Sequence, residues 1–254
     1  MTALLAGAAM IGATSAATTL SNKLRIHFDG SLSGNAYTLG AGEIDTTGTF
    51  AAGASDVSVS GGVATLTGGT QGFKLNPTAI GTLTTQNWVA EAVVSFVSFD
   101  TGQRTIIDVQ GDTDFRIAND GNTLQLSYWD GSEPSNSTLP ALPATDTFVH
   151  MAMVWDAART SLTGYINGVS IGTVDGDAFA TPDVNNLSFG YLGRAGFEGR
   201  GINGQLDAVA FSTFTGAFDV STDFQVSTAQ AVPEPSAAAL FGLGGLALMM
   251  RRRK

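Results

Sequence analysis

Short apolar runs recur along most of the chain, with the alternation of β-strands rather than the period of a helix. Runs rich in β-branched and aromatic residues are separated by Gly, Asn, Asp and Pro, which are typical of turns. No amphipathic helix of useful length and no fixed-period repeat interrupts them. We predict strands at 24–28, 63–66, 72–75, 88–99, 105–109, 115–119, 124–129, 148–155, 162–166, 169–174, 187–189 and 205–211.

The turns between these runs favour antiparallel pairing. Asn167-Gly168 stands between two predicted strands, and Asn-Gly supplies the two positive φ angles of a type I′ hairpin. Along 88–99 both alternating faces are largely apolar, which predicts a central strand that is covered on each side. Many short strands without crossover helices predict an all-β, antiparallel sandwich.

The two ends of the chain are typical of targeting signals. Residues 1–17 carry no charge and run from an apolar stretch into small residues, as in a signal peptide. Because no Lys or Arg precedes the apolar stretch, we expect a basic n-region upstream of the given start. A buried helix is the alternative, and its repeated Gly and Thr make it the weaker interpretation.

The carboxyl end, residues 229–254, combines three features in order. They are the motif Pro233-Glu234-Pro235, a 15-residue apolar stretch from Ser236 to Met250, and the basic tail Arg251, Arg252, Arg253 and Lys254. The stretch predicts a short transmembrane helix of about 22 Å with its basic tail on the cytoplasmic side. This order resembles the PEP-CTERM sorting signal of Gram-negative bacteria.

That resemblance implies a route across the inner membrane. An exosortase would recognise and cleave the tail near Pro233-Glu234-Pro235 after a transient membrane-anchored stage, and the protein would reach the cell surface or extracellular matrix. An ordinary single-pass anchor is the alternative. Whether the mature form stays anchored is left open.

Composition excludes several functions. The chain has 22 acidic and 12 basic residues, and without the basic tail and Glu234 the remainder holds 21 against 8, near −13. Such a charge argues against nucleic acid as a partner. The absence of cysteine excludes disulfides, thiol nucleophiles and thiolate metal sites. Two histidines, His27 and His150, leave little for a histidine-ligated metal centre.

The order of motifs over 18–228 resembles the LamG-like (laminin G, concanavalin A-like) jelly roll. The matching segments are Leu24-Arg25-Ile26-His27-Phe28-Asp29-Gly30, His150-Met151-Ala152, Tyr165-Ile166-Asn167-Gly168 and Gly204-Gln205-Leu206-Asp207-Ala208-Val209. Phe148-Val149 stands where the family usually has Trp-His, and Ala208 where it has Glu. The resemblance implies an antiparallel jelly-roll β-sandwich.

The residues argue against catalysis. Retaining glycosidases of related fold need two carboxylates about 5 Å apart, whereas 88–99 carries the lone acid Glu91. No Gly-x-Ser-x-Gly elbow accompanies either histidine. We therefore predict that the protein is not an enzyme. We also expect Trp88 and Trp155 in the core, and His150 to be a strand residue with a hydrogen-bond partner.

Calcium is the candidate cofactor. Asp207 lies within an apolar closing strand, and the resemblance places it near the opening strand and Asp29, where backbone carbonyls would complete a structural Ca²⁺ site. In the alternative, Asp207 accepts hydrogen bonds from Ser, Thr or backbone groups, or pairs with Arg25. A second candidate is the acidic segment that contains Asp112, Asp114 and Asp120.

Exposed aromatic and basic residues are candidate ligand contacts. Trp129 ends a predicted strand, and Tyr191 and Arg194 lie in a Gly-rich segment. We expect an exported, non-catalytic module that binds a polysaccharide or matrix component at the cell surface. The alternatives are a purely structural envelope or matrix protein and a divergent glycan-cleaving enzyme.

Overall fold

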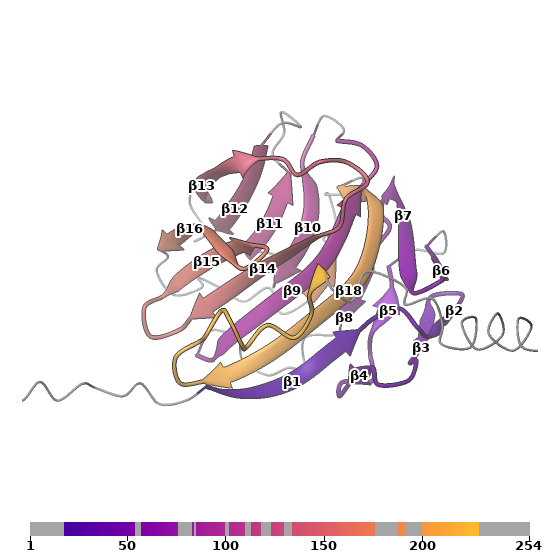
Figure 1. Ribbon diagram of the computed structural model, residues 1–254, viewed down its shortest axis with the longest axis horizontal. Coiled ribbons are helices and arrows are strands. Elements are labelled where there is room, and N and C mark those ends of the chain that lie inside the picture. The colour runs from indigo at the N-terminus through magenta and orange to yellow at the C-terminus, as the bar shows by residue number, and fades with distance from the viewer. Residues whose placement is uncertain are drawn as a thin grey trace, which may run out of the picture.

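The computed structural model is a sandwich of two antiparallel sheets, as the sequence predicts (Figure 1). It describes residues 18–53, 57–75, 83, 85–99, 102–109, 113–117, 123–129, 134–175, 187–190 and 200–228. Within these ranges no helix is long and apolar enough to cross a membrane. The predicted signal peptide and the predicted transmembrane segment lie outside them.

Sheet A is nine-stranded, and its main path runs through seven strands. In order, these are β16 (Val169–Asp175), β15 (Ser161–Ile166), β14 (Val149–Asp156), β9 (Asn87–Phe96), β18 (Gly201–Thr215), β1 (Thr19–Ile26) and β4 (Ile44–Asp45). β7 (Val63–Gly69) also pairs with β18, beyond the end of β1, and β6 (Ser58–Ser60) pairs with β7.

Sheet B is also nine-stranded and lies behind sheet A in Figure 1. Its order is β13 (Pro134–Ala141), β12 (Thr123–Trp129), β11 (Thr113–Ile117), β10 (Arg104–Val109), β17 (Leu187–Phe189), β8 (Phe73–Leu75), β5 (Ala51–Ala52), β3 (Ala36–Thr38) and β2 (Ser31–Ser33).

Each predicted apolar run falls on an observed strand, but several boundaries differ. β1 begins earlier than predicted and ends at Ile26, because Phe28 adopts a φ of 57° and leaves the strand. β9 ends at Phe96 rather than at residue 99. The strands that the sequence analysis missed are β2 to β6, which have two or three residues each, and the polar β13.

The predicted hairpin and central strand are confirmed. Asn167 and Gly168 have φ angles of 49° and 76°, as a type I′ turn requires. β9 lies between β14 and β18, and residues 88–96 are buried on both faces. Trp88 and Trp155 are fully buried and stack with ring centroids 6.4 Å apart, so both belong to the core.

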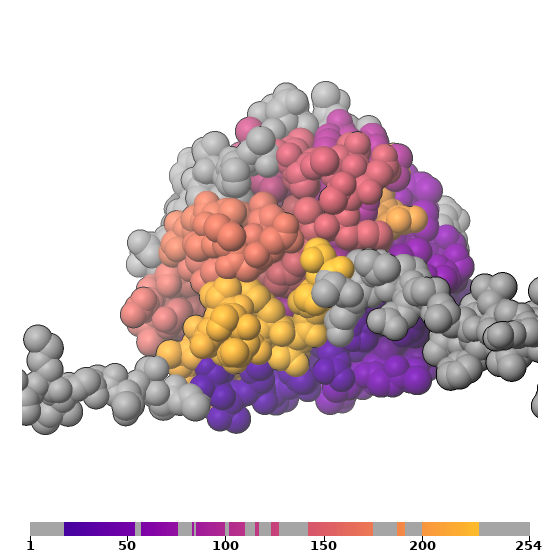
Figure 2. Space-filling view, in the orientation of Figure 1, coloured from indigo at the N-terminus to yellow at the C-terminus, as the bar shows by residue number. Residues whose placement is uncertain are grey.

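A segment after β18 covers the outer face of sheet A. We call residues 216–228 the C-terminal strap; it runs across the front of the sheet in yellow in Figures 1 and 2. Its Val226 packs on Val93, Ala208 and Ala210, which face away from the main core. The strap therefore buries the second face of β9, which sheet B does not reach.

The close approach of β9 and β18 yields a stability prediction. A methyl group at Gly204 would lie 2.1 Å from the Ser95 carbonyl oxygen, so Gly204→Ala must push the two strands apart. We expect a loss of about 3 kcal/mol in unfolding free energy, measured by urea denaturation. Gly164→Ala is the control, because its nearest neighbours are the side chains of Ile171 and Leu126 at 3.3 and 3.4 Å. Equal losses in the two variants would contradict this account.

Candidate functional site

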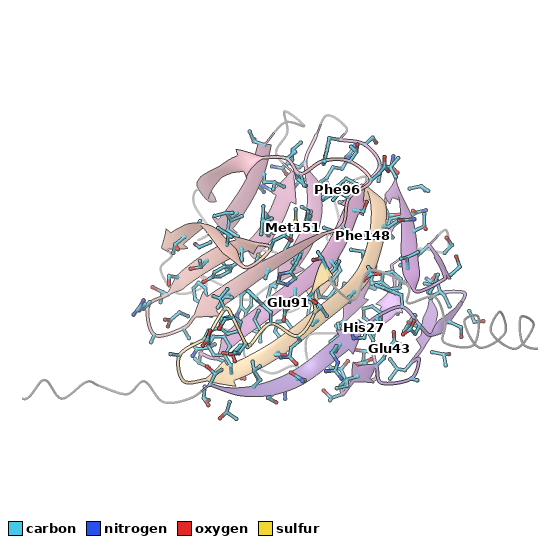
Figure 3. All side chains as sticks on the ribbon, in the orientation of Figure 1. His27, Glu43, Glu91, Phe96, Phe148 and Met151 are labelled. Carbon is cyan, nitrogen blue, oxygen red and sulfur yellow. The ribbon has the colours of Figure 1, made fainter. Side chains whose placement is uncertain are left out.

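The segment that follows β1 is organised by the buried carboxylate of Glu43. Its Oε1 accepts hydrogen bonds from the backbone N–H groups of His27 (2.9 Å) and Asp29 (3.1 Å), and its Oε2 from that of Gly40 (2.6 Å). The Tyr37 hydroxyl donates to Oε1 at 2.9 Å. Figure 3 shows His27 and Glu43 together at the end of β1. Because its oxygens are occupied by donors, Glu43 holds the shape of the loop.

Burial governs the ionisation of this loop. It raises the pKa of Tyr37, and the neighbouring Glu43 raises it further, so the phenol stays protonated. Burial also lowers the pKa of His27, together with the nearby Arg25 charge. The sequence analysis did not select Glu43, because an isolated Glu between short polar segments carries no local signal of a buried loop anchor.

Asp207 lies at a bulge in β18, at the place where two neighbouring strands separate. The pairing of β18 with β9 shifts between Leu206 and Ala208. On its other side, β7 reaches Leu206 and β1 begins at Val209. Asp207 is 7% exposed, yet no described residue donates a hydrogen bond to it.

The structure brings Asp29 close to Asp207. Burial raises the pKa of Asp207 to about 6, and the negative charge of Asp29 adds to this shift. Arg25 donates to the Gly42 carbonyl at 3.3 Å, and no ion pair joins it to Asp207. An acid that is buried, has no hydrogen-bond donor and faces a second acid suits a bound cation. No cluster of three or more Asp, Glu or His side chains occurs within the described residues, so backbone carbonyls would supply the remaining oxygens.

The outer face of sheet B carries polar side chains aligned across strands. Ser188 of β17 pairs in register with Lys74 of β8 and with Asp108 of β10. Their neighbours along the strands, such as Ile107, Val109 and Phe189, belong to the core, so this row faces away from it. Asp108 and Ser188 are fully buried, whereas Lys74 is exposed.

A second polar pair lies beside this row. Arg116 of β11 donates from Nε to Gln125 of β12 at 3.2 Å, and it pairs in register with Thr105 of β10. The sequence analysis treated 105–109 only as a strand and so missed this face. Its signal was the position of Asp108 between two core residues.

The other predicted ligand contacts are placed only in part. Trp129 is the last residue of β12, where its backbone pairs with Pro134. Tyr191 and Arg194 lie outside the described residues, as do Asp112 and Asp120. Asp114 belongs to β11, where its backbone pairs with Asp108 and Ser127.

Glu91 and His150 form a buried polar pair beneath the C-terminal strap. His150 Nε2 lies 3.1 Å from Glu91 Oε2, and both side chains are 5% exposed or less. Glu91 also accepts the backbone N–H groups of Gln225 at 3.0 Å and Val226 at 3.3 Å (Figure 3 shows its place on β9). The predicted partner for His150 is therefore confirmed. The lone acid of the central strand anchors the strap.

Comparisons with known proteins agree with this architecture. A laminin G-type family model of the concanavalin A-like lectin/glucanase superfamily matches residues 67–215. A model of the PEP-CTERM protein-sorting motif matches residues 231–254 and confirms the predicted signal, which indicates export and sorting in Gram-negative bacteria through a membrane-anchored intermediate. Among curated proteins, none matches the chain significantly.

Two solved structures are similar to parts of this chain. A Trypanosoma rangeli sialidase in complex with 2,3-difluorosialic acid matches 74% of this chain at 13% identity with a TM-score of 0.55, but this region is only 30% of the sialidase. The CBM40 of the Ruminococcus gnavus IT-sialidase, bound to α2,3-sialyllactose, matches 58% of this chain and 86% of its own at 17% identity, with a TM-score of 0.47. At 13% identity, the likeness to the T. rangeli sialidase concerns the fold alone.

The contacts of Glu91 predict how the strap is released. Glu91→Gln replaces one acceptor oxygen with an amide group that donates hydrogen bonds and faces the backbone N–H donors of the strap. We therefore expect faster proteolysis within 216–228 and a loss of about 2 kcal/mol in unfolding free energy. Limited proteolysis with mass spectrometry measures this. Asp156→Asn, at the half-exposed end of β14, is the control that leaves the strap protected. A strap that is equally resistant in Glu91→Gln would contradict its role as anchor.

The raised pKa of Asp207 predicts a pH dependence in the presence of a chelator. Between pH 4 and about 6 the folded chain keeps a proton that the unfolded chain has released, so the unfolding free energy falls as pH rises. Asp207→Asn should therefore have a higher Tm than the wild type at pH 7 in EDTA, and the two should converge below pH 4. Asp219→Asn should instead have a lower Tm than the wild type at pH 7, because hydrogen bonds from Ser221 lower the pKa of Asp219. If the Tm of Asp207→Asn and of the wild type varied with pH in the same way, the raised pKa of Asp207 would be refuted.

Proposed function

The chain belongs to the concanavalin A-like lectin/glucanase superfamily, and from this membership we propose that it is an exported, non-catalytic module that binds carbohydrate or another matrix component. Within this proposal residues 18–228 are the exported domain, residues 1–17 a signal peptide and residues 229–254 the sorting segment. An exosortase acts on the tail, and the domain is delivered to the cell surface or extracellular matrix.

Lys74, the exposed residue of the polar row on sheet B, carries the binding proposal. Lys74, Ser188 and Asp108 lie side by side on three strands, facing away from the core. Of these three, Lys74 is exposed, and its ammonium group can donate hydrogen bonds to the hydroxyl groups of a polysaccharide. Ser188 and Asp108 are fully buried beside it and do not reach a ligand.

The state of Glu91 supports a non-catalytic role. A glycosidase needs a pair of carboxylates that reach the glycosidic bond. Glu91, the acid of the central strand, is fully buried and is engaged by His150 and the strap. Glu91 therefore has a structural role, which is to hold the C-terminal strap on sheet A.

Calcium at Asp29 and Asp207 is part of the proposal. The residues fit a divalent cation, because the Asp207 carboxylate lacks a hydrogen-bond donor and faces the Asp29 charge. A bound Ca²⁺ would neutralise both acids and tie the end of β1 to β18. Such an ion would act on stability and on the shape of the loop that Glu43 holds.

Retention on immobilised polysaccharides tests the function. The full chain, purified in detergent, is passed over neutral and acidic polysaccharides in Ca²⁺ and then in EDTA. We expect retention on at least one polysaccharide, weakened about tenfold by Lys74→Ala but not by Arg159→Ala, whose side chain is 82% exposed in the turn between β14 and β15.

The outcomes separate the parts of the proposal. Retention that is lost in EDTA supports calcium-dependent binding, and retention that persists in EDTA contradicts the role of calcium. Failure of the folded chain to bind any polysaccharide would overturn carbohydrate binding and favour a structural envelope or matrix role. Release of reducing ends would overturn the non-catalytic assignment.

A further inference from the structure

β1 begins and β18 ends side by side at the lower left of Figure 1. Four residues with hydroxyl side chains belong to these two strand ends. Thr19 pairs in register with Thr215, and Ser21 pairs with Thr213. Thr213 also pairs with Trp88 of β9, so these residues share the face of the sheet that carries the core. We call them the hydroxyl patch.

The hydroxyl patch occupies the place where the core ends. Farther along the same face, Leu24 and Ile26 are fully buried, whereas Thr19, Ser21 and Thr215 are exposed. The apolar core of the sandwich therefore stops before these last rows of β1 and β18. Hydroxyl groups replace apolar side chains at this point.

Among the described residues, none of these four hydroxyl groups has a hydrogen-bond partner. Other exposed hydroxyls of the described residues are engaged, such as Thr163 with Thr173 at 3.0 Å and Ser221 with Asp219 at 2.6 Å. Those of the hydroxyl patch have no such partner in the part of the chain that the structure describes, and they remain available to a ligand. Because side chains alternate between the two faces of a strand, the four hydroxyl groups lie on one face of β1 and β18 in two adjacent pairs.

A cavity of about 400 Å³ lies over the hydroxyl patch. This volume is within the range of small-molecule sites, about 300–1,000 Å³. The remaining lining is Thr85, Gln86, Asn87, Phe214 and Gly216. The lining therefore offers hydroxyl and amide groups and carries no charged side chain.

We propose that this cavity is a binding site for a neutral saccharide unit. Hydroxyl and amide groups both donate and accept hydrogen bonds, which matches the hydroxyls of an uncharged sugar. An acidic sugar would enter without a basic partner in the lining, on a domain with 21 acidic and 8 basic residues. The site deepens the proposed carbohydrate binding and rests on it.

The cavity is separate from the features already described. The polar row of Lys74, Ser188 and Asp108 lies on sheet B, facing away from the core. Asp29 and Asp207 lie near the opposite end of β1, beyond Ile26. Variants in the hydroxyl patch therefore leave those two regions intact.

Ligand-observed NMR and calorimetry on the full chain in detergent test the site. The probes are oligosaccharides of glucose, galactose and mannose, with a uronic acid oligosaccharide for comparison. The test variant is Ser21→Ala combined with Thr213→Val. A second variant combines Thr19→Val with Thr215→Val, at two exposed positions. The control is Thr38→Val, an exposed threonine on sheet B. Thermal unfolding verifies that each variant is folded.

We expect at least one neutral oligosaccharide to bind, about tenfold more weakly or worse in either double variant, and unchanged in Thr38→Val. Binding that survives in both double variants would overturn this site while leaving carbohydrate binding intact. Preference for the uronic acid probe would also overturn it. Absence of binding to every saccharide, with the polysaccharide panel also negative, would instead overturn the proposed function itself.

Discussion

A strand that is buried on both faces must be covered twice, and β9 imposes this condition on the whole molecule. Its inner face meets the core between the sheets, where Trp88 stacks on Trp155. Its outer face carries Val89, Glu91 and Val93, which sheet B does not reach. The C-terminal strap supplies the second cover. The course of the chain after β18, where the strap crosses this face, meets this requirement.

Glu43, Glu91 and Asp207 are three of the carboxylates that the described part of the fold buries, and their surroundings separate their roles. Glu43 accepts three backbone N–H groups and a tyrosine hydroxyl, and Glu91 accepts the strap. Hydrogen-bond donors surround both carboxylates, which therefore act as structural anchors. Asp207 has no such donor and faces another acid. This contrast is why we assign the cation to Asp207 and not to the other two.

The sequence predicted the strands whose apolar residues alternate, because alternation records which face meets the core. It did not predict β2 to β6 or β13, because these short or polar strands are held by pairing with their neighbours. The strap was also missed. Phe218, Phe224 and Val226 follow neither a strand nor a helix period, so their burial depends on the sheet that they cover.

The strap also decides how the domain responds to a pull. Tension that enters from the sorting segment passes through residues 227–228 and meets the contacts of Gln225 and Val226 with Glu91 before it reaches β18. The strap would lift from its end, a few hydrogen bonds at a time. β18, by contrast, is held along its length by β9, β1 and β7. In the membrane-anchored intermediate, the strap would therefore detach first and lengthen the connection before force reached the sandwich.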